Sequence, residues 1–462
     1  MSEWKKVKIG DFLTERTGRY KPDDKIISQY QRLDKIDFSG NIHISDKPSK
    51  TDMILVQPGD LVISGINVAK GAVAVYQGAE PVCATIHYSS YIFDDKKIDL
   101  EYFKYFVKSP AFLEALKQQV KGGIKTELKS KNLLPLEILI PDLATQKAIV
   151  ENLSHQLKKS ENLQQEIEQQ KSYTKQLRQN ILQDAIEGRL TEEWRKNNPV
   201  VKGNPDFDAE ALFERIQEEK SHTDSILLTQ NQGKKKKGKS LDFPNPCGNT
   251  EKPFVIPEGW KWVRLGEVCN ILGGYAFNSF DLKSSGDNYV LRLGNIRNNQ
   301  IRFEAKPAFV SNKIIENLEI YKTQLNDILL SMTGTRGKKD YLYTVKITKK
   351  HLHHFPMFVN QRVCIIRPNL YPDFIYKTTH SDALKTPLFE SSTGSANQAN
   401  VGIKALNDWL IPLPPLAEQT EIVRVVEAQL AKVDQLEKQI AERETLTKQL
   451  MQSILKDAFG EG

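Results

Sequence analysis

A long internal repeat without gaps constrains this chain more than any other feature of its sequence. Residues Leu143 to Ala185 return as Leu416 to Ala458 at a constant offset of 273 residues, and 19 of the 43 aligned positions are identical. A unit of this size exceeds one supersecondary element and is large enough to hold a domain followed by a helix. The sequence therefore predicts two related domains, each followed by a similar helix.

The duplication extends into the globular parts, but there the offset drifts. Trp4 to Asp11 aligns with Trp260 to Glu267 at an offset of 256, which grows to 260 at Arg32 and to 267 at Gly59. Such drift is expected where loops have changed around a retained scaffold. Short β-rich runs broken by Gly, Asn and Pro, with brief helices between them, predict an α+β domain in each copy.

The repeated segments have the periodicity of a coiled coil. Apolar or small residues recur at alternating steps of four and three, in the same register in both copies. The predicted seam consists of Ile149, Leu153, Leu163, Ile167, Leu177 and Ile181 in the first copy and of Ile422, Val426, Leu436, Ile440, Leu450 and Ile454 in the second. Neither segment contains Gly or Pro, whereas Pro141 and Pro414-Pro415 stand just before the two starts. Each helix would be roughly 60 to 65 Å long.

The simplest partner for each helix is the other helix of the same chain. Two alternatives remain open, because each helix could instead pack on its own globular domain or pair with another molecule. A parallel and an antiparallel pair are both possible, since the connector between the copies is long enough to return. We expect five segments, namely a first globular domain, a central helix, a connector with a Lys-rich piece, a second globular domain and a distal helix: 1–142, 143–187, 188–259, 260–408 and 409–462.

Composition excludes several classes of protein. With 462 residues, 39% of them apolar and 27% charged, the chain suits two to four soluble domains. The four cysteines are far apart without a CxxC pair, so neither a disulfide framework nor a cysteine zinc site is indicated. We expect a cytoplasmic protein with no membrane association, because the sequence shows no signal peptide and no run of 18 apolar residues.

The net charge of +7 is small for this length, but its distribution is uneven. Residues 260–408 hold 20 Lys and Arg against 12 Asp and Glu, so the excess lies in the second globular segment.

Two motifs resemble enzyme signatures without their structural context. Gly233 to Ser240 fits the P-loop spelling, but Pro244 and Pro246 follow it and exclude the helix that a phosphate cradle needs. Pro205-Asp206 with Glu218 and Lys220 fits a loose nuclease spelling, yet Glu218 and Lys220 fall two apart in one helical run and so point in different directions. The four lysines of the first motif suit a solvated linker, or else a tethered patch on a nucleic acid backbone.

No other pattern in the sequence suggests catalysis or a metal site. His351-Leu-His-His354 is the densest histidine cluster, but no carboxylate or cysteine is spaced to complete a metal site, so none is expected. The sequence has no NPP[FY] box, no G-x-S-x-G elbow and no G-x-G-x-x-G after a strand. We therefore expect a protein without catalytic residues or cofactors of its own.

Polar, planar and basic side chains fill the irregular parts of both globular segments. Arg can grip guanine bidentately and Asn or Gln can grip adenine, so this composition suits reading of the DNA major groove with clamping of the backbone. For any one of these residues alone, surface solvation is the simpler explanation. The candidates are Arg16, Arg19, Tyr20, Lys21, Arg32, Asn67, Lys70 and Lys125 in the first copy, and Arg292, Asn295, Arg297, Asn298, Arg302, Arg336, Lys338, Lys339, Asn397 and Gln398 in the second.

Several motifs together resemble the specificity subunit of type I restriction-modification systems. They are Pro412-Leu-Pro-Pro-Leu-Ala-Glu-Gln419 with its counterpart Ile140-Pro-Asp-Leu-Ala-Thr-Gln146, the extension Gly188-Arg-Leu-Thr-Glu-Glu-Trp-Arg195, the repeated Ile-Leu-x-Asp-Ala ends, and Pro257 to Gly266, which resembles the opening of a target recognition domain. The resemblance covers nearly the whole chain. It departs where the first copy has Asp142 and Thr145 in place of Pro415 and Glu418, and in the lack of a second copy of the extension.

The resemblance implies a non-catalytic subunit that reads a split sequence in double-stranded DNA, with one half for each recognition domain. It implies an antiparallel helix pair with pseudo-two-fold symmetry, which would serve as a ruler and as the dock for two methyltransferase subunits. One DNA turn is about 34 Å, well within the reach of such helices. Restriction and translocase subunits would join through the complex, and S-adenosylmethionine, ATP and Mg would be bound by the partner subunits.

Two other functions remain as alternatives. The chain could be a scaffold whose helices assemble a complex while its globular domains bind protein rather than DNA. It could also be a nucleotide-dependent enzyme that uses Lys239. The half-sequences, the spacer length and the residues that contact bases do not follow from the sequence.

Overall fold

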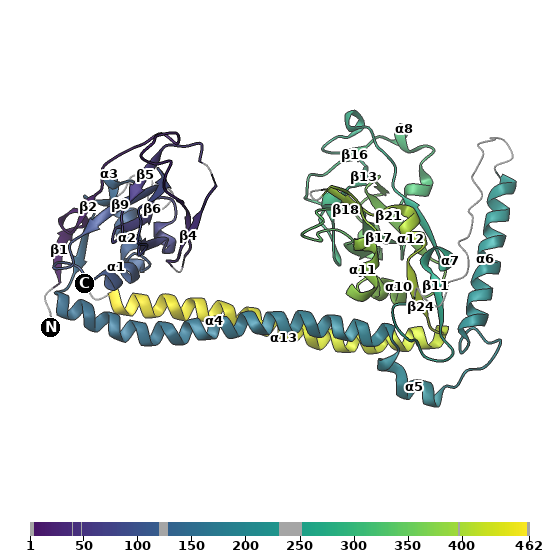
Figure 1. Ribbon diagram of the computed structural model, residues 1–462. Coiled ribbons are helices and arrows are strands. Elements are labelled where there is room, and N and C mark those ends of the chain that lie inside the picture. The colour runs from purple at the N-terminus through teal and green to yellow at the C-terminus, as the bar shows by residue number, and fades with distance from the viewer. Residues whose placement is uncertain are drawn as a thin grey trace. The chain divides into compact units, whose positions relative to one another are not determined.

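The computed structural model describes residues 4–38, 40–47, 49–119, 128–230, 252–395 and 398–459. The chain divides into two compact units, which are considered separately below (Figure 1). Residues 1–171 and 438–462 form unit 1, and residues 172–437 form unit 2. Each unit therefore contains one globular part and one stretch of each of two long helices, α4 (Leu143–Ile186) and α13 (Leu416–Phe459).

Unit 1 is an α+β domain built around two four-stranded sheets. One sheet has the order β2-β9-β6-β7 and the other β4-β3-β8-β5, while β1 and β10 form a separate antiparallel ladder. The strands are β1 (Lys5–Lys8), β2 (Leu13–Glu15), β3 (Arg32–Ile36), β4 (Ile42–Ser45), β5 (Met53–Val56), β6 (Leu61–Ser64), β7 (Val73–Val75), β8 (Val82–Thr85), β9 (Tyr88–Phe93) and β10 (Glu137–Ile140). The short helices are α1 (Leu100–Phe106), α2 (Pro110–Gln119) and α3 (Ser130–Leu133).

Unit 2 repeats this plan with additional elements. Its largest sheet has the order β12-β21-β17-β19, and smaller sheets have the orders β16-β13-β20, β18-β23-β22, β14-β15 and β11-β24. The strands are β11 (Lys261–Arg264), β12 (Cys269–Gly273), β13 (Asn288–Leu291), β14 (Ile296–Arg297), β15 (Gln300–Ile301), β16 (Phe309–Val310), β17 (Ile328–Ser331), β18 (Thr333–Gly334), β19 (Thr344–Lys346), β20 (Met357–Val359), β21 (Val363–Pro368), β22 (Thr393–Ser395), β23 (Gln398–Asn400) and β24 (Leu410–Leu413). Its helices, besides the stretches of α4 and α13, are α5 (Glu192–Asn197), α6 (Ala209–Gln230), α7 (Leu265–Val268), α8 (Asn312–Ile315), α9 (Lys349–Leu352), α10 (Pro372–Thr378), α11 (Asp382–Glu390) and α12 (Ile403–Asn407).

The order of strands shows that the duplication includes the globular folds. The sheets β2-β9-β6-β7 and β12-β21-β17-β19 have the same antiparallel topology, and β6 and β17 are the strands that the sequence aligns at an offset of 267. The parallel pair β3–β8 of unit 1 likewise corresponds to the parallel pair β13–β20 of unit 2. The prediction of two related α+β domains is therefore confirmed.

The repeated glutamine of the two helix starts has a structural task. Gln146 and Gln419 are both buried, and the side-chain Nε2 of each donates to the carbonyl of a proline five residues earlier, Pro141 or Pro414. The side-chain oxygen of Gln146 also accepts from the backbone N–H of Asp99, at the start of α1. Each glutamine thus fixes the direction in which its long helix leaves the preceding strand.

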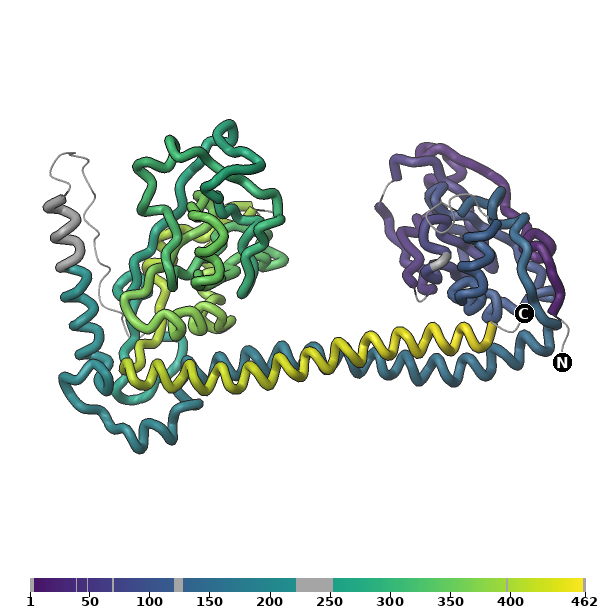
Figure 2. Tube along the Cα trace, turned by 180° about the vertical axis from the view of Figure 1, so that it is seen from behind, coloured from purple at the N-terminus to yellow at the C-terminus, as the bar shows by residue number. Residues whose placement is uncertain are grey.

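The helices α4 and α13 run antiparallel, as two local arrangements show (Figures 1 and 2). In unit 1 the start of α4 packs against the end of α13, where Leu153 and Leu157 share a core with Leu455 and Phe459. In unit 2 the end of α4 packs against the start of α13, as in the core that contains Ile181 and Ile422. Each helix has 44 residues and is therefore about 66 Å long. The pseudo-two-fold relation between the units stays a prediction.

The seam between the helices differs from the predicted one at three of the twelve predicted positions. Leu153, Ile167, Ile181, Ile422, Val426 and Ile440 are buried, and Ile149, Leu163 and Ile454 are half-buried. Leu177, Leu436 and Leu450 are instead 41%, 44% and 47% exposed, so their assignment to the seam was wrong.

Polar residues one position later occupy the alternate places of the seam. Gln164 donates to the sulfur of Met451 at 3.6 Å, and Lys171 lies 2.8 Å from Glu444, both in unit 1. In unit 2, Arg178 lies 3.0 Å from Glu437. Along this series one residue number rises by seven as the other falls by seven, which is the register of an antiparallel pair. The apolar pattern pointed to the wrong neighbours because the true positions are polar.

Two further segments differ from the predicted division. Residues Leu410–Leu413, which the division placed in the distal helix segment, form β24 and pair with β11. The connector contains α5 and α6, and α6 includes the predicted helical run that holds Glu218 and Lys220. The Lys-rich stretch 233–240 lies outside the described residues.

Candidate nucleic-acid interface

The β18-β23-β22 sheet of unit 2 carries a hollow lined by planar polar side chains. It has a volume of about 460 Å³ and is formed by Thr333, Gln361, Arg362, Gly394, Ser395, Gln398 and Asn400. Gly394 in β22 lies close to the backbone of β23, since it has φ +95° and a Cβ there would lie 2.2 Å from the carbonyl oxygen of Gln398. Only glycine fits this position without moving the backbone.

The groups in this hollow are exposed and can reach a ligand. Gln361, Arg362, Gln398 and Asn400 are all exposed. When the side-chain amide of Gln398 is turned so that its oxygen faces Arg362, this oxygen accepts from the guanidinium at 3.3 Å. The two planar groups therefore lie beside each other. A guanidinium and amides at a surface are the groups that bind base edges bidentately. This hollow, the "amide hollow" below, is thus the best candidate in unit 2 for base contacts.

A larger, basic cavity lies elsewhere in unit 2, between α10, α11 and the unit 2 stretches of α4 and α13. Its volume is about 1060 Å³, and it brings together the predicted residues Asn298, Lys338 and Lys339 with Lys175 and Lys385, which were not predicted. Asn298 also accepts at 3.2 Å from the backbone N–H of Thr344. We call this the "lysine cavity".

Unit 1 has a hollow of about 420 Å³ that contains the predicted Arg32. It is lined by the segment 27–32, which holds Gln29 and Gln31, and by Ser45, Asp46 and Lys47. Arg32 is ion-paired with Asp34, and Gln31 donates to Asp46 at 3.0 Å. The same residue types therefore line hollows in both units, although the first hollow contains more carboxylate.

Two of the predicted DNA contacts, Asn295 and Arg16, already have hydrogen-bond partners within the fold. Asn295 is 1% exposed, and its amide donates to the carbonyls of Arg302 and Ala305 and to the hydroxyl of Tyr289, so it closes its own loop. Arg16 forms two hydrogen bonds of 2.6 and 2.7 Å to the buried carboxylate of Asp60. These hydrogen bonds raise the pKa of Arg16, with a smaller opposing effect of burial.

The Arg16–Asp60 pair has a counterpart in unit 2 that supports its structural role. Asp327, which aligns with Asp60, is 2% exposed and lies 2.9 Å from Arg367. Burial raises the pKa of the Asp327 carboxyl, opposed by the hydrogen bond from Arg367. Because both copies hold an arginine on the same buried aspartate, this contact belongs to the scaffold.

The remaining predicted residues lie at the surface or in local contacts. Among them, Lys21 and Arg19 lie 3.0 and 3.4 Å from Asp52, and the Lys70 ammonium lies 5.5 Å from the centre of the Phe38 ring. The backbone of Tyr20 pairs with that of Met53, and Asn67 precedes a 3-10 turn. Arg292 and Arg336 donate to the carbonyls of Lys306 and Ser392. Arg297 lies over the ring of Tyr343, and Arg302 lies near Glu304. Lys125 and Asn397 lie outside the described residues.

Gln361 and Arg362 of the amide hollow were not among the predicted residues. They directly precede the strand β21, which begins at Val363. A polar pair directly before a run of apolar residues marks the surface end of a buried strand, and this signal could have identified both.

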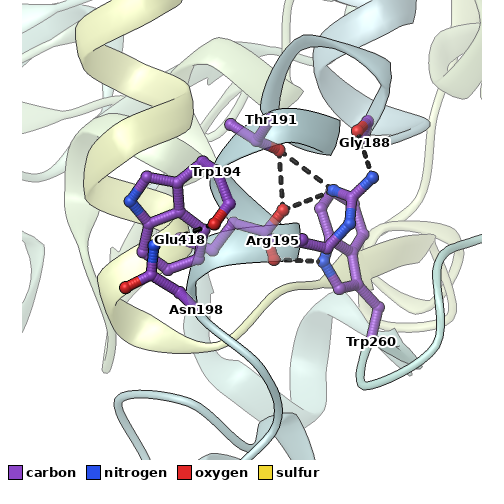
Figure 3. Close-up of polar contacts among 7 residues, drawn as sticks. All are labelled: Gly188, Thr191, Trp194, Arg195, Asn198, Trp260 and Glu418. Carbon is purple, nitrogen blue, oxygen red and sulfur yellow. Dashed lines mark hydrogen bonds and ion pairs between the residues drawn. The ribbon is translucent and has the colours of Figure 1, made fainter.

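The connector meets the start of α13 in a buried polar network (Figure 3). Glu418 is 1% exposed and accepts hydrogen bonds from the Thr191 hydroxyl, the Arg195 guanidinium and the Trp260 indole at 2.6, 2.5 and 2.6 Å. Arg195 also donates to the carbonyl of Gly188 at 2.6 Å. Gly188 has φ +76°, and a Cβ there would lie 2.5 Å from Pro257, so the extension after α4 needs glycine at this turn.

This network explains why the two helix starts differ in sequence. In copy one, Asp142 caps α4 by accepting from the backbone N–H of Thr145 at 2.9 Å. In copy two the cap is replaced by the connector, since the carbonyls of Pro205 and Asp206 accept from the first N–H groups of α13 at 3.1 Å. Glu418 stands where copy one has Thr145, and every partner of its carboxylate that Figure 3 shows comes from the connector or from Trp260.

The residues of the nuclease-like spelling have structural partners. Lys220 donates to the carbonyls of Gly266 and Cys269 at 2.6 and 3.2 Å, at the end of α7. Pro205 and Asp206 cap α13 as described above. Within the described part of the chain, no group of three or more His, Cys, Asp or Glu side chains could hold a metal ion, and no helix is long and apolar enough to cross a membrane.

The architecture defines a duplicated recognition protein: two related α+β units, each with a polar hollow, joined through a shared helix pair. The chain belongs to the family of the type I restriction modification DNA specificity domain, whose model matches residues 1–170 and 257–443.

Relatives of known role are similar over much of the chain. The type I restriction enzyme EcoAI specificity subunit of Escherichia coli is 32% identical over 250 residues, which are 54% of this chain but only 38% of the length of that protein. The EcoKI specificity subunit of Escherichia coli strain K12 is 24% identical over 408 residues, covering 87% of this chain and 75% of that subunit.

The fold has a counterpart among solved structures. A chain from a study of complex assembly and conformational transition of the type I R-M system superposes with a TM-score of 0.62 at 17% identity, covering 99% of this chain and 97% of that one. The two-domain α+β fold with long helices is therefore that of type I restriction-modification specificity subunits.

Proposed function

We propose that this chain is the DNA-reading subunit of a type I restriction-modification enzyme and performs no catalytic step itself. Each unit reads one half of a bipartite target, and the bases between the halves remain unread. The observation that carries this proposal is the amide hollow, where Arg362, Gln361, Gln398 and Asn400 are exposed together on one small sheet. Guanidinium and amide groups match the acceptor and donor patterns of guanine and adenine in the major groove.

The long helices offer matching surfaces for two copies of one partner. Tyr173 and Leu177 on α4 are 64% and 41% exposed, and Leu446 and Leu450 on α13 are 62% and 47% exposed. These pairs lie at equivalent positions of the 273-residue repeat, and each pair is four residues apart, so each forms an apolar spot on one helix face. Exposed apolar spots mark interaction sites. Two methyltransferase subunits would therefore dock on the two spots.

The catalytic groups and cofactors of the complex belong to the partners in this proposal. S-adenosylmethionine would bind to the methyltransferase subunits, and ATP and Mg to the restriction subunits that join through them. The chain itself recognises the DNA target and sets the distance between its two halves.

Selection from a random pool of double-stranded DNA tests the reading function. The chain is mixed with its cognate methyltransferase subunit, and the bound DNA is sequenced. We expect enrichment of one bipartite motif, and Arg362→Ala should relax the preference within one half by about 1 to 3 kcal/mol for each lost base contact. Arg424→Ala, on the exposed face of α13, is the matched control and should leave the motif unchanged. A pool without any enriched motif would contradict the proposal.

Partner stoichiometry tests the docking spots independently of DNA. Replacing Tyr173 and Leu177 by Ser should leave one methyltransferase subunit bound, as should replacing Leu446 and Leu450, and all four changes together should leave none. The control is Ile320→Ser, since Ile320 is 56% exposed and lies on the 3-10 turn Glu319–Tyr321 of unit 2 rather than on α4 or α13. Mass photometry of the purified complexes gives the count, and two bound subunits in the fourfold variant would refute this assignment. Docking without sequence preference would favour the scaffold alternative.

A further inference from the structure

A lysine occupies a core position of α11 in unit 2. Lys385 is 6% exposed and lies between the buried Leu384 and Leu388 on this short helix. Its ammonium has no hydrogen-bond or ion-pair partner among the residues that the structure describes. A buried cation without a partner lowers stability, because desolvation is not offset by an opposite charge. Burial lowers the pKa of Lys385 to about 8, with a smaller opposing effect of Asp382.

The first repeat shows that the fold does not require a charge at this position. Before α2 of unit 1 the side chain of Ser109 accepts from the backbone N–H of Phe112, as Ser381 accepts from Leu384 before α11. This shared cap aligns the two helices and places Leu113 at the position of Lys385. A leucine is thus compatible with this fold, and the lysine requires a different explanation.

The lysine cavity in front of Lys385 has an excess of positive charge. Its helix side carries Glu427, Asp434 and Glu437, but these carboxylates already pair with Lys377 and Arg178. Lys175, Lys338, Lys339 and Lys385 line the same cavity, and none of them has an ion pair within the described part of the chain. Asp382 is the one carboxylate of the lining without such a pair there. The cavity would therefore attract an anion.

The shape and the remaining lining suit a phosphate group with an organic body. At about 1060 Å³ the cavity is as large as small-molecule sites in proteins. Phe389 lines the cavity with a half-buried aromatic ring, and Lys339 lies 5.3 Å from the centre of that ring. Lysine is a strong phosphate ligand as a point charge. We propose that the lysine cavity binds a phosphate group, with Lys385 as its innermost ligand and Lys338 and Lys339 at its rim.

The phosphate can come from a DNA backbone or from a free nucleotide, and competition experiments distinguish the two sources. Only the DNA source rests on the proposed function above. Calorimetric titration of the full chain with inorganic pyrophosphate tests the site without DNA. We expect saturable binding to the natural protein, at least tenfold weaker binding to Lys385→Leu, and unchanged binding to Lys313→Leu, which alters an exposed lysine on α8.

Folding of the variant is measured at the same time. Lys385→Leu should unfold at an equal or higher temperature than the natural protein, because it replaces an unpaired buried charge by the residue of the first repeat. Lys385→Met, which keeps the length of the side chain, serves as a second variant with the same expectation.

A 20-base-pair duplex of unrelated sequence then identifies the source. If DNA supplies the phosphate, the duplex competes with pyrophosphate, and Lys385→Leu reduces the salt dependence of duplex binding by about one counterion. If a free nucleotide supplies it, the duplex does not compete and ADP does. Equal pyrophosphate binding by the natural protein and both Lys385 variants, or no binding by any of them, would overturn the proposed site. If the natural protein binds pyrophosphate but not the duplex, only the proposed DNA function is contradicted and the phosphate site stands.

Discussion

At the scale of single residues, Glu418 shows how one buried carboxylate joins three segments. It contacts the extension after α4 through Thr191 and Arg195 and the opening of the second globular part through Trp260. Removal of one partner of a buried ion pair leaves the other charge without compensation. We therefore expect Glu418→Ala to lower the free energy of unfolding by about 3 to 5 kcal/mol. Urea unfolding followed by tryptophan fluorescence measures this loss.

The control for this prediction lies one turn further along the same helix. Glu421 pairs with Arg424 at 2.6 Å, and the arginine is 67% exposed. Exposed pairs contribute little because water screens them. Glu421→Ala should leave unfolding nearly unchanged, and an equal loss from both variants would show that the network around Glu418 has no special role.

His380 makes the stability of unit 2 depend on pH. Its ring contacts Tyr376 and Thr344, and burial lowers its pKa to about 4. An unfolded histidine has a pKa of about 6.5, so below that pH the unfolded state binds a proton that the folded state does not. Stability is therefore lost as pH falls from 7 towards 4. We expect a loss of about 1 to 2 kcal/mol at pH 5 from this residue.

A variant isolates the histidine from the other titrating groups. The free energy of unfolding is measured by urea between pH 7.5 and 5 for the natural protein and for His380→Asn. The natural protein should lose more stability over this range than the variant, and parallel curves would contradict the assignment.

Single residues were also the hardest feature to predict from the sequence. The types of side chain that could contact DNA follow from composition, but their availability depends on neighbours that are distant in the chain. Arg16 is held by Asp60, 44 positions away, and Asn295 is buried by its own loop. Arg362 becomes a candidate only because the β22–β23 hairpin places Gln398 and Asn400 next to it.

At the scale of elements, the polar seam determines which helices pair. Lys171 and Glu444 lie 2.8 Å apart, and this contact together with the one to Lys448 lowers the pKa of Glu444 to about 2. We expect Lys171→Glu alone and Glu444→Lys alone to lower the melting temperature of the helix pair, because each places like charges together. The double variant restores opposite charges and should recover the natural value.

The double-mutant cycle separates the pair from the single substitutions. Circular dichroism gives the melting temperatures, and light scattering shows whether a single variant dimerises through its exposed seam. Additive effects in the double variant would mean that the two side chains do not interact in solution.

The two long helices followed from the sequence, whereas part of their contact surface did not. Absence of Gly and Pro, capping signals and the repeat predicted α4 and α13 closely, because helix formation depends on local preferences. The seam failed at Leu177, Leu436 and Leu450, because a hydrophobic pattern cannot detect a contact made by Gln164, Lys171 and Arg178. The direction of pairing came from the family resemblance, since local patterns are the same for both directions.

At the scale of the whole molecule, we expect the two halves of the DNA target to be independent. Residues 260–408 contain the amide hollow and those lysines of the lysine cavity that lie outside the long helices. Exchange of this segment for the equivalent one of a relative should change one half of the recognised sequence only. Methylome sequencing of a host that carries the hybrid with its methyltransferase shows both halves at once. A change in both halves would disprove modular recognition.

The second prediction at this scale concerns the length of the helices. Residues 168–174 and 441–447 are equivalent in the repeat and are centred on the paired residues Lys171 and Glu444, so their joint deletion removes one matched heptad from each helix. The deletion shortens each helix by about 10 Å. We expect the unread spacer of the DNA target to shorten or the complex to fail to assemble. Methylome sequencing measures the spacer, and an unchanged spacer with full methylation would contradict the function of the helices as a ruler.

The contact between Lys171 and Glu444 also bears on the origin of this chain. These two residues occupy the same position in the two repeats and contact each other, so this position of one repeat pairs with the same position of the other. In an ancestor that had one repeat and dimerised in this register, the same amino acid would have faced itself, and a charged residue there would have been repelled. In a single chain that holds both repeats the two positions can differ, and Lys171 and Glu444 carry opposite charges there.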